Sequence, residues 1–98
     1  MDITKTKNAA ALNVALAGRL DTTTAPKLEA ELDASLEGIT DLTLDFAALE
    51  YISSAGLRVL LAAQKRMNKQ GSMVIKNVCD DIREVFEITG FADILTVE

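Results

Sequence analysis

Two hydrophobic periods alternate along this chain of 98 residues. Apolar residues at every second position are typical of strands, whereas apolar residues spaced by about 3.6 positions are typical of helices. The period-two segments are Ile3–Lys7, Ala10–Ala17, Asp41–Phe46, Met73–Lys76 and Ile94–Val97. The helical segments begin within Thr22–Pro26, at about Ala55 and at Asp80, and they end near Gly38, Gly71 and Gly90. Strands that alternate with helices predict a mixed, mostly parallel sheet with right-handed crossovers.

Turn and cap residues bound these elements. The polar residues around Asn8 predict a hairpin between the first two strands, at the edge of the sheet. A loop is expected over Ala47–Ser54, and Ser53 or Ser54 can cap the helix that follows. We therefore predict a single α/β domain over residues 1–98, with a sheet of four to five strands and helices packed mainly on one face.

The amino-acid composition excludes or disfavours several classes of function. With 49% apolar residues, the chain can bury one hydrophobic core. Its net charge of -5 repels the phosphate backbone and disfavours nucleic-acid binding. No run approaches the roughly 18 apolar residues of a membrane span, and the single cysteine, Cys79, allows no intrachain disulfide. We expect a cytoplasmic protein without a membrane segment, in which Cys79 is partly buried.

The chain has no histidine, which excludes Ser-His and Cys-His nucleophiles and His-ligated zinc sites. Its five glycines form neither of the glycine-rich phosphate-binding loops, so no cofactor and no metal are expected. Asp45 ends a predicted strand, where a structural role as a hydrogen-bond acceptor is favoured over phosphate acceptance. We predict that the chain is not an enzyme. The alternative from the enzyme class is a small carboxylate hydrolase that uses Asp21 or Asp45.

Two polar segments are expected to share one rim of the sheet. The segments Gly18–Thr22 and Ala47–Ser54 both follow the carboxyl ends of strands and precede helices. The rim would hold a carboxylate and several hydroxyls but no base, a combination suited to being modified or recognised. From the residues alone, Ser53 and Ser54 can also be merely an N-cap pair, with Asp21 capping the first helix.

The run Tyr51–Leu61, YISSAGLRVLL, resembles the signature of the STAS domain, and Gly18–Asp21, GRLD, resembles the earlier G-x-L-D turn of that family. The resemblance covers essentially the whole chain. In the family, a serine two residues before the signature glycine is phosphorylated by a partner serine kinase, the anti-sigma factor. That serine corresponds to Ser54, and the essential aspartate of the earlier turn corresponds to Asp21.

The chain departs from the commonest STAS pattern at two positions. Ser53 stands where many relatives carry Asp, and Ala55 stands where they carry a second Ser or Thr. Because alanine cannot accept a phosphate, these departures leave Ser54 as the predicted phosphorylation site.

The resemblance implies an anti-sigma factor antagonist. Its unphosphorylated form would bind an anti-sigma factor serine kinase and free a sigma factor, phosphorylation of Ser54 would end the binding, and a protein serine phosphatase would restore it. The predicted partner-binding residues are Asp21, Thr22, Ser53, Ser54, Gly56 and Arg58. The alternative is a STAS domain that serves as a constitutive structural or regulatory subunit of a transport or signalling complex, in which Ser54 is only a helix cap.

Overall fold

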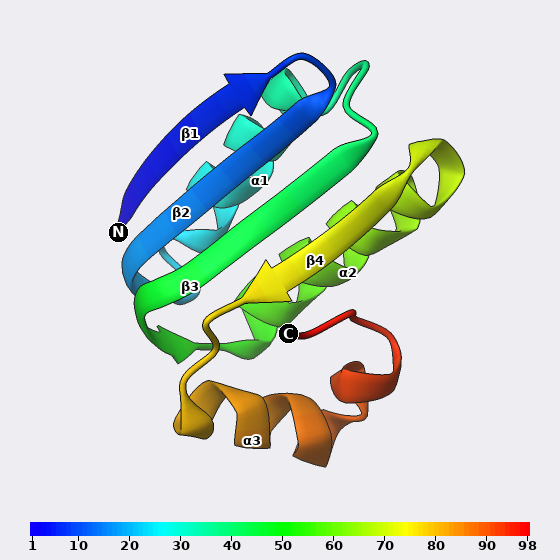
Figure 1. The fold of residues 1–98 in the computed structure, drawn as a ribbon. Coiled ribbons are helices and arrows are strands. Elements are labelled where there is room, and N and C mark those ends of the chain that lie inside the picture. Colours follow the sequence, from blue (N-terminus) through cyan, green and yellow to red (C-terminus); the bar gives the residue numbers. More distant parts are fainter.

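The computed structural model describes residues 1–98 and contains a four-stranded sheet in the order β1-β2-β3-β4. The elements along the chain are β1 (Asp2–Asn8), β2 (Ala11–Leu20), α1 (Ala25–Ser35), β3 (Asp41–Ile52), α2 (Ser54–Gln70), β4 (Ser72–Lys76), α3 (Asp80–Thr89) and a 3-10 turn (Phe91–Asp93). Strand β1 is antiparallel to β2, whereas β2, β3 and β4 are mutually parallel (Figure 1). The predicted mixed, mostly parallel sheet is confirmed.

The hairpin that opens the sheet is also confirmed. Asn8 and Ala11 are register partners, and the two residues between them form the turn. Ala9 adopts a φ of 55°, a left-handed conformation that tight hairpin turns require. Strand β1 therefore lies at the edge of the sheet.

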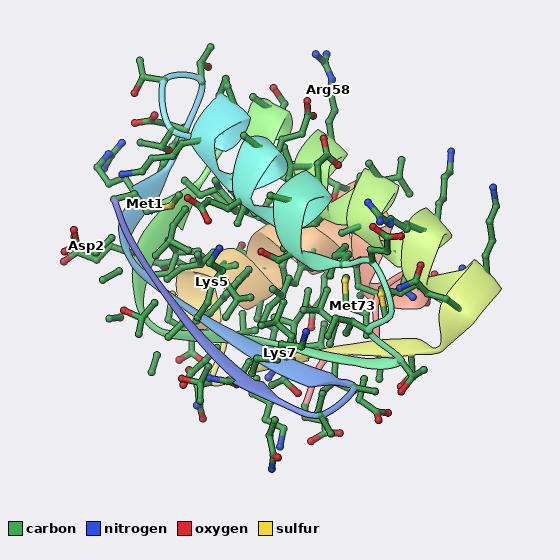
Figure 2. The ribbon with its side chains drawn as sticks, turned by 90° about the horizontal axis from the view of Figure 1, so that it is seen from above. Met1, Asp2, Lys5, Lys7, Arg58 and Met73 are labelled. Atoms are coloured by element: carbon green, nitrogen blue, oxygen red, sulfur yellow. The ribbon has the colours of Figure 1, made fainter.

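The helices cover one face of the sheet. Figure 2 shows α1 and α2 on the same side of the four strands, as predicted. The alternating residues Leu12, Val14 and Leu16 of β2 are buried, as are Leu28 and Leu32 of α1. These side chains belong to one cluster of 24 buried hydrophobic residues. Burying each of the larger side chains in this cluster contributes about 1.5–3 kcal/mol, so this single core holds the two layers together. None of the helices combines the length and the apolarity that crossing a membrane requires.

Strand β3 is longer than predicted. The loop expected from Ala47 onward is instead the second half of the strand, which continues to Ile52. Its pairing with β2 shifts register twice there, and the buried residues Phe46, Leu49 and Ile52 are spaced by three positions. Because an irregularity of this kind adds a residue to one strand, it breaks the period of two by which strands are identified.

The fifth predicted strand, Ile94–Val97, is reduced to a single bridge between Val97 and Ile75 of β4. The backbone N–H of Ile75 donates to Thr96 at 2.9 Å, and that of Glu98 donates to Ile75 at 2.8 Å. The N–H of Leu95 instead donates to Phe91 at 2.8 Å, because the 3-10 turn curls the preceding segment. The sheet has four strands.

The prediction for Cys79 was wrong, since its side chain is exposed. Cys79 is the N-cap residue of α3, with extended backbone, and its carbonyl accepts the N–H of Arg83 at 2.9 Å. A residue at this position belongs to the turn between β4 and α3. It therefore does not share the burial of the neighbouring strand.

Candidate regulatory site

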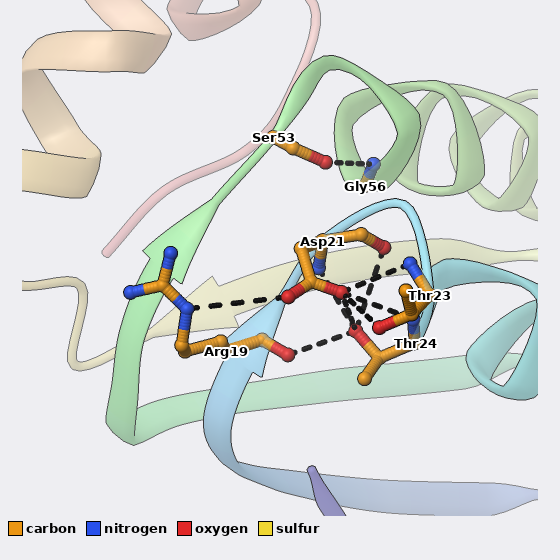
Figure 3. Close-up of polar contacts among 6 residues, drawn as sticks. All are labelled: Arg19, Asp21, Thr23, Thr24, Ser53 and Gly56. Atoms are coloured by element: carbon orange, nitrogen blue, oxygen red, sulfur yellow. Dashed lines mark hydrogen bonds and ion pairs between the residues drawn. The ribbon is translucent and has the colours of Figure 1, made fainter.

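The two predicted polar segments meet at one end of the sheet. Leu20 at the end of β2 and Ile52 at the end of β3 are register partners, and the N–H of Ser53 donates to the carbonyl of Leu20 at 2.9 Å. Asp21 follows Leu20 directly, and Ser53 follows Ile52 (Figure 3). Parallel pairing therefore places the aspartate and the serines on a common rim.

Asp21 is held by the turn that leads into α1. Its Oδ1 atom accepts the hydroxyl of Thr23 at 2.7 Å, the N–H of Thr23 at 3.0 Å and the N–H of Thr24 at 3.2 Å. These hydrogen bonds, that of the Thr23 hydroxyl above all, lower the pKa of the Asp21 carboxyl because they favour its ionised form. Asp21 thus caps the turn and presents a fixed negative charge.

The hydroxyl of Thr24 closes the same turn. Its oxygen accepts the N–H of Asp21 at 2.8 Å and donates to the carbonyl of Arg19 at 2.8 Å. The backbone on both sides of Leu20 is therefore tied to the start of α1 (Figure 3).

Arg19 and Tyr51 form a neighbouring pair that the sequence did not reveal. They are register partners on β2 and β3, and the guanidinium carbon of Arg19 lies 4.1 Å from the centre of the Tyr51 ring. The Nε atom of Arg19 is 4.0 Å from Oδ2 of Asp21. This pairing could not be foreseen because β3 was expected to end before Tyr51; the only signal in the sequence is that both residues adjoin the two motifs.

The two serines have different roles. Ser53 is the N-cap of α2, and its hydroxyl oxygen accepts the N–H of Gly56 at 3.5 Å. Ser54 is the first helical residue, is exposed, and its hydroxyl makes no hydrogen bond within the chain. The capping role that the sequence allowed for either serine therefore belongs to Ser53. Ser54 has a free hydroxyl.

Gly56 lies in the first turn of α2 and is buried against the ends of two strands. A Cβ atom on this residue would lie 2.7 Å from Cγ of Leu20 and 2.9 Å from Cγ1 of Ile52. Close packing inside the domain accounts for the glycine, and its burial does not favour the direct partner contact that was predicted for it.

Replacing Gly56 with alanine is expected to lower the free energy of unfolding by about 1–3 kcal/mol, because the new methyl group overpacks the contact with Leu20 and Ile52. Urea denaturation would measure the loss. Ser54→Ala in the same helical turn, where the side chain is exposed, is the control and should change the stability by less than about 0.5 kcal/mol. Equal stability of Gly56→Ala and wild type would contradict the packing role.

Thr22 and Arg58 lie on a surface groove of about 290 Å³ between the first turns of α1 and α2. Both are exposed, and Arg58 makes no ion pair within the chain. The full lining is Thr22, Ala25, Pro26, Glu29, Ala55, Arg58 and Val59. The structure thus brings these two predicted partner-binding residues together beside the rim.

Asp45 serves as a structural hydrogen-bond acceptor, as predicted. Its Oδ1 atom accepts the N–H of Ala47 at 2.9 Å and the side-chain amide of Asn77 at 3.0 Å. The bond from Asn77 is the main cause that lowers the pKa of the Asp45 carboxyl. Because the pKa values of both Asp21 and Asp45 are lowered, both carboxyls favour the ionised form, and neither is suited to act as a general acid near neutral pH.

The chain forms a small α/β domain whose polar rim carries a carboxylate and several hydroxyls. The family model described as "Mlab, STAS domain" matches residues 3–96, and the chain belongs to the STAS family. BtrV of Bordetella bronchiseptica, to which an anti-sigma factor antagonist role is attributed, is 41% identical over 99% of this chain and 85% of its own length. The anti-sigma-B factor antagonist of Bacillus subtilis is 31% identical over 99% of this chain and 88% of its own length.

Solved structures share the fold. The anti-sigma factor antagonist SpoIIAA in its unphosphorylated form superposes with a TM-score of 0.78 at 17% identity, covering 99% of this chain and 87% of SpoIIAA. Its phosphorylated form superposes with a TM-score of 0.77, covering 99% of this chain and 91% of SpoIIAA. The chain is thus a STAS domain homologous to anti-sigma factor antagonists.

Proposed function

We propose that this protein is an anti-sigma factor antagonist controlled by phosphorylation of Ser54. The unphosphorylated form binds an anti-sigma factor serine kinase and thereby frees a sigma factor. Phosphorylation by that kinase ends the binding, and a protein serine phosphatase restores it. Two relatives, 41% and 31% identical over 99% of the chain, are anti-sigma factor antagonists by name, and they support the antagonist part of the proposal.

The observation that carries the proposal is the free hydroxyl of Ser54. Because Ser53 provides the helix cap, Ser54 can be modified without losing that cap. A phosphate there would lie at the start of α2, where the helix dipole favours an anion by about 0.3–1 kcal/mol. The fold therefore tolerates the modification, and its effect falls on the docked surface.

The proposed docking surface consists of the rim and the adjoining groove. Asp21 and Ser53 lie on the rim beside Ser54, and Thr22 and Arg58 line the groove. Its charges are mixed, since Asp21 is a fixed anion and Arg58 is an unpaired cation. A dianion added at Ser54 changes the charge pattern that a partner must match.

Intact mass spectrometry tests the proposal. The protein is incubated with ATP and with each anti-sigma-type serine kinase of its host, and one phosphate is expected. Ser54→Ala should lose that phosphate, whereas Ser53→Ala should keep it. A folded sample that gains no phosphate with any kinase would favour the alternative, a constitutive subunit of a transport or signalling complex in which Ser54 has no regulatory role.

A further inference from the structure

We propose that Arg58 is the counter-charge for a phosphate on Ser54, so that phosphorylation engages an arginine that is otherwise free to contact the partner. This inference rests on the proposed function, because it concerns the phosphorylated form of that site. Ser54 and Arg58 are four positions apart on α2, which places their Cβ atoms about 5–6 Å apart on one helix face. Because helical side chains lean toward the N-terminus, the side chain of Arg58 can reach back over the turn that holds Ser54.

Arg58 is available for this role. Its side chain is exposed, and it takes part in none of the ion pairs of the chain. Glu29 of α1 lines the same groove but does not approach it within ion-pair distance. Figure 2 shows the side chain extending from α2 away from the sheet. The guanidinium of Arg58 can therefore bind a phosphate without breaking an existing ion pair.

Three other cations, on β2, α1 and α2, are engaged or too distant. Arg19 lies against Asp21, and it also stacks on a tyrosine ring. Lys27 on α1 acts on Glu31, whose pKa is lowered mainly by its ion pair with Lys5 of β1 and to a smaller extent by Lys27. Lys65 is exposed on α2, but at 1.5 Å of rise per residue it lies about 16 Å along the axis from Ser54. On α2, Arg58 is the only cation within about one helical turn of Ser54.

The chemistry of the pair favours arginine. The planar guanidinium matches two phosphate oxygens at once, whereas a lysine ammonium acts as a point charge. A phosphoserine carries about -1.5 to -2 charges at neutral pH, so it competes for Arg58 more strongly than the single carboxylate of Glu29. Phosphorylation would thus change the docking surface twice. It adds negative charge, and it removes the free arginine.

Phosphoserine installed at position 54 during translation allows a test that needs no kinase. The second ionisation of the phosphate is followed by phosphorus NMR during a pH titration, in the otherwise wild-type protein and in Arg58→Gln. Loss of the counter-charge should raise the apparent pKa of the phosphate, a decrease of roughly two- to fivefold in its ionisation constant, as expected for an exposed ion pair. The acidic groups of the same surface, Asp21 and Glu29, are present in both proteins.

Lys65→Gln is the matched control, because it removes one positive charge from the same helix at a greater distance. It should leave the titration nearly unchanged. Equal shifts in Arg58→Gln and Lys65→Gln, or no shift in Arg58→Gln, would overturn the pairing while leaving phosphorylation of Ser54 intact. Conversely, the absence of any kinase for Ser54 would contradict the proposed function without altering this titration.

Discussion

Alanine at position 71 is expected to lower the free energy of unfolding by about 3 kcal/mol or more, the upper end of the cost of overpacking. A Cβ atom on Gly71 would collide with the carbonyl oxygen of Thr40, and it would lie 2.6 Å from the carbonyl carbon and 2.7 Å from Cα of that residue. These are backbone atoms, which cannot rotate away as a side chain can. The connection between α2 and β4 would have to move.

The surrounding hydrogen bonds limit that movement. The carbonyl of Thr40 accepts the N–H of Ser72 at 2.9 Å, next to the point where Asp41 and Ser72 begin the pairing of β3 with β4. The N–H of Gly71 donates to Met67 at the end of α2. Displacing the Thr40 carbonyl therefore strains the ends of a helix and of two strands together.

Thermal unfolding of Gly71→Ala measures the effect. For a domain of this size, a loss of about 3 kcal/mol corresponds to a decrease of roughly 12–24 °C in Tm. Ser72→Ala is the control at the adjacent position, where the side chain is exposed and forms no hydrogen bond, and it should leave Tm nearly unchanged. A Gly71→Ala variant as stable as wild type would mean that the connection can shift at little cost.

Gly71 also illustrates what a local pattern can predict. Its position after a helical segment predicted that α2 ends there, and the structure confirms this end. The steric reason is the contact with Thr40, which lies 31 positions earlier in the chain and is brought close only by the crossover from β3 through α2 to β4. The hydrophobic period of a segment depends on that segment alone, so it cannot predict a contact between residues that are far apart in the sequence.

The strands likewise include parts that the sequence pattern predicts and parts that it does not. The part of β2 that alternates regularly, from Leu12 to Leu16, was predicted from its pattern. The second half of β3 was not, because the register shifts against β2 place Leu49 and Ile52 in the core at a spacing that no simple strand period contains. Irregular pairing depends on the partner strand, and the partner is known only once the sheet is assembled.

The candidate site was predicted in outline for a related reason. The rim follows from parallel strands whose carboxyl ends meet at one edge, so the proximity of Asp21 to the serines was foreseeable. The division between Ser53 as the cap and Ser54 as the free hydroxyl was not, because either serine is an acceptable N-cap and the choice depends on where α2 begins. A shift of one residue in the start of α2 would therefore change which serine hydroxyl is free for phosphorylation.

That division predicts opposite consequences for two substitutions at Ser54. Ser54→Asp is expected to weaken binding to the anti-sigma factor about a hundredfold, because it adds a negative charge to the docking surface and engages Arg58, and charges that the partner no longer matches cost roughly 3 kcal/mol or more in an interface. Ser54→Ala removes only a hydroxyl that has no partner within the domain, and it should bind nearly as tightly as wild type. Isothermal titration with the purified anti-sigma factor would measure both affinities.

Circular dichroism and thermal unfolding of the two variants separate an interface effect from a folding defect. Both variants should unfold as wild type does, since Ser54 is exposed and Ser53 keeps its cap in each of them. A folded Ser54→Asp protein that bound as tightly as wild type would show that charge at this position does not control docking. Weak binding by Ser54→Ala would instead mean that the partner uses the hydroxyl itself, so phosphorylation would act by blocking that contact.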